Sequence, residues 1–242
     1  MSGYILTEVD STLDEARRVA TGLAGPTWII AKKQTSARGR RGRAWVMPEG
    51  NFAATLVLQP NEVLSVLALR SFVMSLAVFD AVTKFLGSSD GLALKWPNDV
   101  LLNGGKLAGI LLESTSGAKS GMSLAIGVGV NLIAFPEKGD VETQAVRPVS
   151  VLSETGVHVE LLDFVTCLAQ IYDDLEQQFQ NFGFGPIRHK WMTHAARLGE
   201  VITARTGTTA FVGTFMDVDK EGCLVLETDE GRVVLPAADV YF

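Results

Sequence analysis

Four arginines stand within six residues, in the segment Arg-Gly-Arg-Arg-Gly-Arg at positions 38–43. A guanidinium group binds phosphate or carboxylate through paired hydrogen bonds, and the interleaved glycines let the backbone approach a ligand closely. Because neighbouring positive charges repel one another, we expect this arginine loop to stay mobile until an anion binds. Taken alone, the segment fits a solvated basic loop, a nucleic-acid contact or an anion-binding site.

Two segments further along the chain carry groups suited to anion chemistry. Lys95, Asn98 and Asp99 surround a proline turn, which should aim the amide and the carboxylate outward. A carboxylate there can hold Mg²⁺ or accept a proton from an amine, although an ordinary turn is the structural alternative. Lys106 then begins an apolar strand, and Gly109 in that strand would let a ligand approach closely.

A glycine-containing strand ends the series, with Gly127, Gly129 and Asn131 at alternate positions. The third glycine of a dinucleotide-binding fingerprint is missing, so we do not expect a Rossmann domain. Two glycines on one face of a strand instead leave room for a flat ring, to which Asn131 can supply hydrogen bonds. Plain irregularities of the strand are the structural alternative.

The overall composition narrows the classes of partner. The 242 residues carry a formal net charge of −6, whereas a protein that mainly grips DNA is usually basic. The two cysteines stand apart without metal-ligand spacing, which favours reduced thiols and a cytoplasmic location. The apolar stretch 64–86 contains Arg70 and Asp80, so we expect a buried core helix and no membrane partner.

The periodicity of apolar residues predicts the elements that must position these groups. The expected helices are residues 12–21, capped by Ser11 or Thr12, then 64–86, a short one from 151 to 156, 161–182 and 187–196. The expected strands are residues 4–9, 27–32, 52–58, 92–96, 100–102, 106–114 and 123–131, followed by 200–206, 209–218, 223–228 and 232–236.

The change from mixed to purely β elements predicts two domains. Residues 1–198 would form a large domain that carries the candidate residues, and residues 199–242 a small all-β domain. So short a domain is weakly stable by itself, so we expect the second domain to dock on the first.

In this order and at these separations, the segments resemble the biotin protein ligase family, in the form that lacks an N-terminal DNA-binding domain. The matching positions are Ser11 and Thr12, Gln34, residues 38–43 with Trp45, 95–99, 106–111 and 127–131. The resemblance covers nearly the whole chain. It implies an α+β fold, in which a class II synthetase-like catalytic domain with a mixed sheet and flanking helices precedes a small SH3-like β-barrel at the C-terminus.

The resemblance also implies a reaction. The carboxylate of biotin attacks the α-phosphorus of ATP, with Mg²⁺ on the phosphates, and gives biotinyl-5′-AMP and pyrophosphate. A lysine amine of a biotin carboxyl carrier protein then attacks the adenylate and releases AMP. No DNA partner is expected, and a homodimer formed through a sheet edge is compatible with such a chain.

Residue roles follow from the resemblance position by position. The candidate catalytic residues are Lys106, Arg40 and Asp99, of which Asp99 is a candidate base or metal ligand. The candidate biotin-binding residues are Ser11, Thr12, Gln34, Arg38, Gly39, Arg40, Lys106 and Gly109. The candidate nucleotide-binding residues are Arg41, Arg43, Trp45 (stacked near the adenine), Lys95, Asn98 and Asn131. Arg38 and Arg40 would hold the biotin carboxylate and the adenylate phosphate.

Two positions depart from the family pattern. Leu13 stands where an asparagine is usual, so a hydrogen bond to biotin is either missing or supplied by another group. Ala37 stands where the loop usually has a glycine. If position 37 needs a positive φ or a close approach of the ligand, alanine costs about 1 kcal/mol there. We therefore expect the adenylate to leave faster than it would from a Leu13→Asn, Ala37→Gly double variant.

Two other functions fit parts of the pattern. A lipoate or octanoate protein ligase shares the fold and the adenylate chemistry, but the arginine loop and segment 95–99 favour biotin. A non-catalytic ligand-binding or RNA-binding module would use the basic loop alone. The net charge of −6 and the presence of Lys106, Asp99 and Asn131 argue against such a module.

Overall fold

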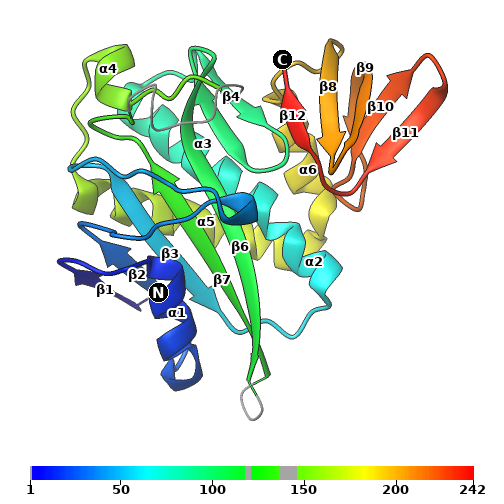
Figure 1. The fold of residues 1–242 in the computed structure, drawn as a ribbon. Coiled ribbons are helices and arrows are strands. Elements are labelled where there is room, and N and C mark those ends of the chain that lie inside the picture. The colour runs from blue at the N-terminus through cyan, green and yellow to red at the C-terminus, as the bar shows by residue number, and fades with distance from the viewer. Residues whose placement is uncertain (1, 118–120, 137–145) are drawn as a thin grey trace.

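The computed structural model describes residues 2–117, 121–136 and 146–242 (Figure 1). Seven strands of these residues form one sheet, in which β1 and β2 are parallel and the other neighbours antiparallel. In sheet order the strands are β1 (Ser2–Leu6), β2 (Thr27–Ala31), β3 (Phe52–Leu58), β7 (Gly121–Val130), β6 (Gly105–Gly117), β5 (Asp99–Leu102) and β4 (Leu92–Lys95).

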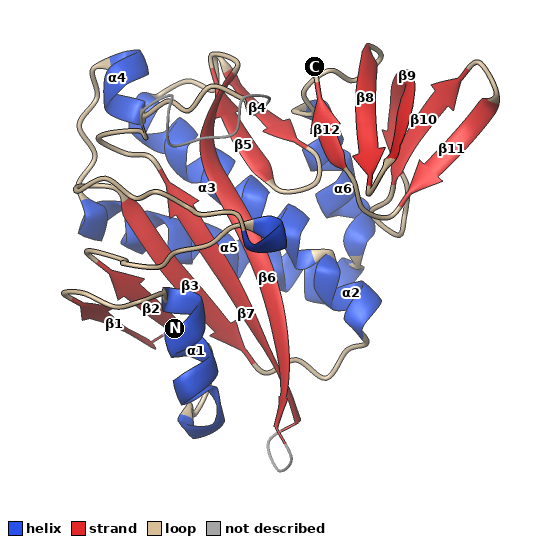
Figure 2. Cartoon of the chain, viewed as in Figure 1, coloured by secondary structure: helices blue, strands red, loops and turns tan. Residues whose placement is uncertain are grey.

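Helices lie on both faces of this mixed sheet (Figure 1, Figure 2). On one face α3 (Arg70–Leu86) and α5 (Leu161–Phe182) pack against inward side chains such as Ile126 and Val128 to form the main core. On the other face α1 (Thr12–Val19) buries a smaller cluster around Leu13. The remaining α-helices of the described residues are α2 (Leu64–Ala68), α4 (Val151–Thr155) and α6 (Phe184–Thr193).

The expected helix 64–86 is divided at Leu69 into α2 and α3. Among the described residues, this stretch alone is long and apolar enough to cross a membrane, judged by length and composition. However, 72% of its most apolar window is buried inside the protein. Arg70 is also buried and pairs with Glu176 of α5, with 2.7 Å between Nη2 and Oε1. This burial agrees with the predicted core helix.

The last part of the chain forms a second, antiparallel sheet in the order β11 (Gly231–Leu235), β10 (Leu224–Thr228), β9 (Thr209–Val218), β8 (Val201–Thr206) and β12 (Asp239–Tyr241). It docks on the rest of the protein through Trp96, whose Nε1 donates to Gly222 O at 3.0 Å, and through an Arg188–Asp217 ion pair. The sequence does not predict β12. The expected α+β fold with a small C-terminal β domain is confirmed.

Several element boundaries differ from the prediction, and the differences at β1 and α6 have a physical reason. β1 ends at Leu6, and Val9 pairs only through an isolated bridge to Gln34. α6 begins at Phe184 and therefore includes Pro186 in its first turn, where the missing N–H of proline has no intrahelical acceptor to lose.

Candidate functional site

A cavity of about 340 Å³ lies on the sheet face that bears α1. Residues of β6 and β7 line it, together with the start of α1, the arginine loop and β12. The candidate residues that line this cavity are Ser11, Thr12, Gln34, Arg38, Gly39, Arg40, Arg43, Trp45, Lys95, Asn98, Asp99, Lys106, Gly109 and Asn131. Of the candidates, Arg41 does not line it and instead pairs with Asp239. Folding thus gathers motifs from distant parts of the chain around one space.

Residues 37–45, which we call the arginine hairpin, fold back on themselves. At the base, Trp45 N donates to Ala37 O at 3.0 Å. At the tip, the backbone turns through positive φ values at Arg41 (57°) and Gly42 (73°). Ala37 does not have a positive φ. A positive φ therefore adds no cost to alanine at position 37, and a cost from the close approach of a ligand stays a prediction.

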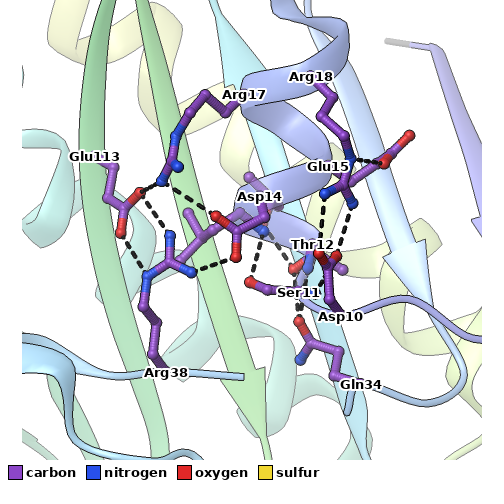
Figure 3. Close-up of polar contacts among 12 residues, drawn as sticks. Asp10, Ser11, Thr12, Asp14, Glu15, Arg17, Arg18, Gln34, Arg38 and Glu113 are labelled. Atoms are coloured by element: carbon purple, nitrogen blue, oxygen red, sulfur yellow. Dashed lines mark hydrogen bonds and ion pairs between the residues drawn. The ribbon is translucent and has the colours of Figure 1, made fainter. Parts of the chain in front are cut away.

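Carboxylates of other elements pair with the base of the arginine hairpin (Figure 3). Arg38 lies 2.5 Å from Asp14 of α1 and 3.0 Å from Glu113 of β6. These hydrogen bonds stabilise the charged guanidinium and raise the pKa of Arg38 above its ordinary value. Carboxylates of the protein thus neutralise the charge of Arg38 at this end of the loop, and the expected mobility of the loop before an anion binds stays a prediction.

The tip of the arginine hairpin contacts β12 of the C-terminal domain. Asp239 Oδ2 lies 2.6 Å from Arg41 Nη1 and 2.7 Å from Arg43 Nη2. Arg40 donates to Ala238 O at 3.2 Å, and its Nη1 is 3.9 Å from Asp239 Oδ1. Asp239 is itself buried, so one carboxylate of the C-terminal domain offsets part of the repulsion among three arginines.

The indole of Trp45 lies across two strands where both carry glycine. Gly109 of β6 and Gly129 of β7 are opposite each other in register. A Cβ added to Gly129 would stand 2.6 Å from the ring of Trp45. The glycine strand thus leaves room for a flat ring as predicted, and at Gly129 this ring is the indole of Trp45. Lys106 Nζ lies 5.6 Å from the ring centroid, within range of a cation–π contact.

Asp99 is buried between two lysines. Its Oδ1 lies 2.8 Å from Lys106 Nζ and its Oδ2 lies 3.8 Å from Lys95 Nζ. Burial alone would raise the pKa of Asp99, but the charges of Lys106, Lys95 and Arg40 outweigh it and hold the pKa below its usual value. The predicted outward orientation of Asp99 is wrong, because the β4–β5 register sets it opposite Lys95.

These surroundings of Asp99 do not fit a metal ion. Mg²⁺ takes oxygen ligands, whereas both oxygens of this carboxylate face ammonium groups. In the part of the chain that the structure describes, no three or more His, Cys, Asp or Glu side chains gather as a metal site. The assignment of Asp99 as a metal ligand is therefore not kept.

Two asparagines that line the cavity are hydrogen-bonded to neighbouring residues of the protein. Asn98 Nδ2 donates to Ile110 O at 2.5 Å, and Asn98 Oδ1 accepts from Arg40 Nη1 at 3.4 Å. Asn131 is buried, and its Oδ1 accepts from Asn51 Nδ2 at 3.2 Å. Asn98 thus joins the turn after β4 to β6 and contacts Arg40. A direct contact of either asparagine with a nucleotide stays a prediction.

The start of α1 and Gln34 form another wall of the cavity. Figure 3 shows the polar contacts between them. Ser11 caps α1, since its Oγ accepts from Leu13 N at 3.2 Å. Gln34 Oε1 accepts from N and Oγ1 of Thr12 at 2.8 and 3.1 Å, which fixes the carboxamide. Gln34 Nε2 reaches only the weak acceptor Met47 Sδ at 3.8 Å, so the fixed carboxamide leaves this donor available to a ligand carbonyl at little cost.

Leu13 is part of an apolar cluster rather than a polar contact. Its buried side chain packs with Ala16, Val57 and Ala125. A Cβ added to Gly127 would stand 3.0 Å from Leu13, so the first glycine of β7 makes room for this leucine. The wall at this point is therefore apolar.

The sequence does not single out three acidic residues that contact the arginine hairpin. Asp239 belongs to a strand too short to show a pattern. Asp14 is an ordinary acidic residue of a first helical turn. Glu113 follows Gly109 by two strand periods, and this alternation is the signal that could have placed both on one face.

Two known sequence families match this chain. Residues 4–131 match the Biotin/lipoate A/B protein ligase family, and residues 198–242 match the Biotin protein ligase C terminal domain. The chain is 49% identical to a biotin–[acetyl-CoA-carboxylase] ligase of Paracoccus denitrificans, over 98% of this chain and 99% of the relative. It is 30% identical to a bifunctional ligase/repressor of Bacillus subtilis, over 96% of this chain and 71% of the relative.

Solved structures show the same fold. A biotin protein ligase from Aquifex aeolicus, in complex with biotin and ATP, aligns with a TM-score of 0.85 at 24% identity over 99% of this chain and 97% of the other. A biotin protein ligase from Leishmania major aligns with a TM-score of 0.69 at 21% identity over 98% and 99%. With both sequence families matched in order and a relative 49% identical along nearly its full length, the chain belongs to the biotin protein ligase family.

Proposed function

We propose that this chain activates biotin with ATP and transfers the biotinyl group to a lysine of a carrier protein. The observation that carries the proposal is one cavity that Lys106 and Arg40 line together with Gln34. The two cations suit a carboxylate and a phosphate, and the Gln34 amide suits the uncharged polar ring of biotin. The names of the relatives support the same activity.

The first step joins two anions, which is the difficulty that the site must overcome. A carboxylate oxygen of biotin attacks the α-phosphorus of ATP, so that an O–P bond forms and the P–O bond to pyrophosphate breaks. Lys106 and Arg40 would hold the two anions together and stabilise the charge that develops between them. Mg²⁺ would enter with the nucleotide as part of the substrate, and we assign it no carboxylate of the described chain.

The second step forms an amide. An uncharged lysine amine of the carrier attacks the adenylate carbonyl carbon, the C–O bond to AMP breaks, and the nitrogen gives up a proton. Asp99 would be a weak acceptor for that proton, because the neighbouring cations lower its pKa. We therefore propose that Asp99 orients Lys106 rather than serving as the base.

Replacing Asp99 by asparagine tests this role. We expect adenylate formation to slow by up to about 100-fold, because Lys106 loses the carboxylate that fixes its ammonium group. Transfer from preformed biotinyl-5′-AMP should slow much less. Rapid-quench measurement of each half-reaction distinguishes the two roles, since a larger loss in transfer than in activation would make Asp99 the base.

Replacing Leu13 by asparagine should restore a polar contact to the biotin pocket. We expect the adenylate to dissociate about fivefold more slowly, the effect of one added hydrogen bond. The ligand-free variant should lose about 1–3 kcal/mol of unfolding free energy, since an amide would replace a packed leucine. Adding Ala37→Gly should not slow release further, because position 37 needs no positive φ. A chase of labelled adenylate measures release, and unchanged or faster release from Leu13→Asn would contradict the expectation.

One assay tests the function as a whole. The protein is incubated with MgATP and either biotin or lipoate, and pyrophosphate release is measured. We expect release with biotin only. Release with lipoate only would instead identify a lipoate ligase, and no release with either would favour a non-catalytic binding module.

The partner that we propose is the biotin carboxyl carrier of acetyl-CoA carboxylase, the enzyme named in a relative at 49% identity. The net charge of −6 argues against DNA as the main partner. A homodimer is also proposed, because β1 forms an edge of the large sheet. Transfer of labelled biotin to an isolated carrier domain and sedimentation of the pure protein test these two statements.

A further inference from the structure

Four charged side chains from three elements form a closed ring at the base of the arginine hairpin (Figure 3). Arg38 of the hairpin donates Nε and Nη2 to the two oxygens of Glu113, at 3.1 and 3.0 Å, and Nη1 to Asp14 at 2.5 Å. Arg17 closes the ring, 3.2 Å from Asp14 and 3.3 Å from Glu113. Two guanidinium groups and two carboxylates therefore balance in charge and join the hairpin to α1 and β6.

We propose that Asp14 and Glu113 are positioning residues which, through Arg38, hold the arginine hairpin closed over the bound adenylate and set how slowly it leaves. This inference rests on the proposed function. It differs from the role that the resemblance implies for Arg38, because Arg38 would hold the hairpin rather than bind the substrate anions.

The geometry of Arg38 differs from that of an ordinary surface ion pair. The Arg38, Asp14 and Glu113 side chains are only 22–27% exposed, and the contact with Glu113 uses two parallel hydrogen bonds. Networks and two-point guanidinium–carboxylate contacts contribute more than single exposed pairs, which often contribute almost nothing. An incoming anion would have to displace two carboxylates to bind Arg38.

Arg40 has the opposite surroundings. Its hydrogen bonds go to neutral oxygens, Asn98 Oδ1 at 3.4 Å and Ala238 O at 3.2 Å, and the carboxylate of Asp239 is 3.9 Å away. Burial lowers the pKa of Arg40, as expected for a cation that lacks close neutralisation. The two arginines therefore have different roles: Arg38 anchors the hairpin, and Arg40 is available to bind a substrate anion.

The ring of four charged side chains lies at the base of the hairpin, next to the residue that covers the cavity floor. Arg38 is paired in an isolated bridge with Ala44, directly before Trp45, whose indole covers Gly109 and Gly129. Because Arg38 and Trp45 lie at the same base, opening that end would move Trp45 away from the cavity floor. Loss of the carboxylates should thus loosen the hairpin without removing any group that contacts the reacting atoms.

The test uses Asp14→Asn, Glu113→Gln and the double variant, with Glu15→Gln as the matched control. Glu15 lies on the same helix and pairs with Arg18 at 2.7 Å. In the double variant we expect labelled adenylate to dissociate about tenfold faster, while its rate of formation at saturating substrates changes less than twofold. Arg38→Ala added to the double variant should not speed release further. The control should behave as the parent protein does.

Hydrogen exchange of residues 37–45 in the ligand-free protein gives a readout that does not depend on the reaction. We expect the amide of Trp45, bonded to Ala37 O, to exchange faster in the double variant and at the parental rate in Glu15→Gln. Unchanged exchange would overturn the inference, as would slower release of adenylate, which would mean that the carboxylates had been withholding Arg38 from the ligand. If the parent protein forms no adenylate, the proposed function fails while the exchange test still decides the role of the ring.

Discussion

Replacing Lys106 by methionine is expected to slow formation of biotinyl-5′-AMP by about 100-fold to 1,000-fold, the usual effect of removing one group that stabilises developing charge. Methionine keeps the apolar stem but removes the ammonium group that lies 2.8 Å from Asp99 and faces Trp45. The reaction loses a cation where a carboxylate and a phosphate must meet. Single-turnover pyrophosphate release at saturating biotin and MgATP measures the rate.

The matched control is Lys220→Met, because the Lys220 side chain is 88% exposed and lies in a turn of the C-terminal domain. Its rate should equal that of the parent protein. Lys106→Met should also transfer biotin from preformed adenylate with a smaller loss, since the activation step is already complete. If Lys106→Met activates biotin within tenfold of the parent rate, Lys106 is not the group that stabilises the first step.

Replacing Glu176 by leucine is expected to lower the free energy of unfolding by about 3–5 kcal/mol, because it leaves a buried charge without its main partner. Arg70 is 1% exposed and donates Nη2 and Nε to Glu176 Oε1 at 2.7 and 3.0 Å. Glu62, at 2.8 Å from Arg70, is partly exposed and would compensate only in part. Urea denaturation followed by circular dichroism measures the loss.

The double variant Arg70→Met, Glu176→Leu should recover most of that loss, since two apolar side chains would fill the space of the ion pair. Glu8→Gln is the control for an exposed pair, because Glu8 and Lys33 are 53% and 64% exposed, and its effect should stay below about 1 kcal/mol. Equal losses in the single and double variants would show that packing, and not the unpaired charge, determines the effect.

Several elements of the fold follow from local sequence patterns. β3 and α5 have the predicted bounds, because alternation and helical spacing are properties of consecutive residues. The turn at Asn103 and Gly104 has the positive φ values, 50° and 75°, that an Asn-Gly hairpin requires. Such patterns could not predict the short strand β12, since it forms only by pairing with β8.

Local sequence motifs also predict which residues belong to the site, but not which of their side chains contact one another. The order of the motifs identified the family and a set of candidate residues, all of which except Arg41 line the cavity. The direction of Asp99 was predicted wrongly, because the proline turn does not specify which face of the β4–β5 hairpin is covered. The flat ring predicted beside the glycine strand proved to be an internal one, Trp45.

Local sequence patterns predict the family of this protein, most of its elements and the side chains available for binding anions. The pairing of those charges depends on tertiary contacts. Arg38 is paired with Asp14 and Glu113, and Arg41 and Arg43 with Asp239, across long stretches of chain. The physical reason is that Coulomb attraction and hydrogen bonding depend on distance in space, which the position of a residue along the chain does not reveal.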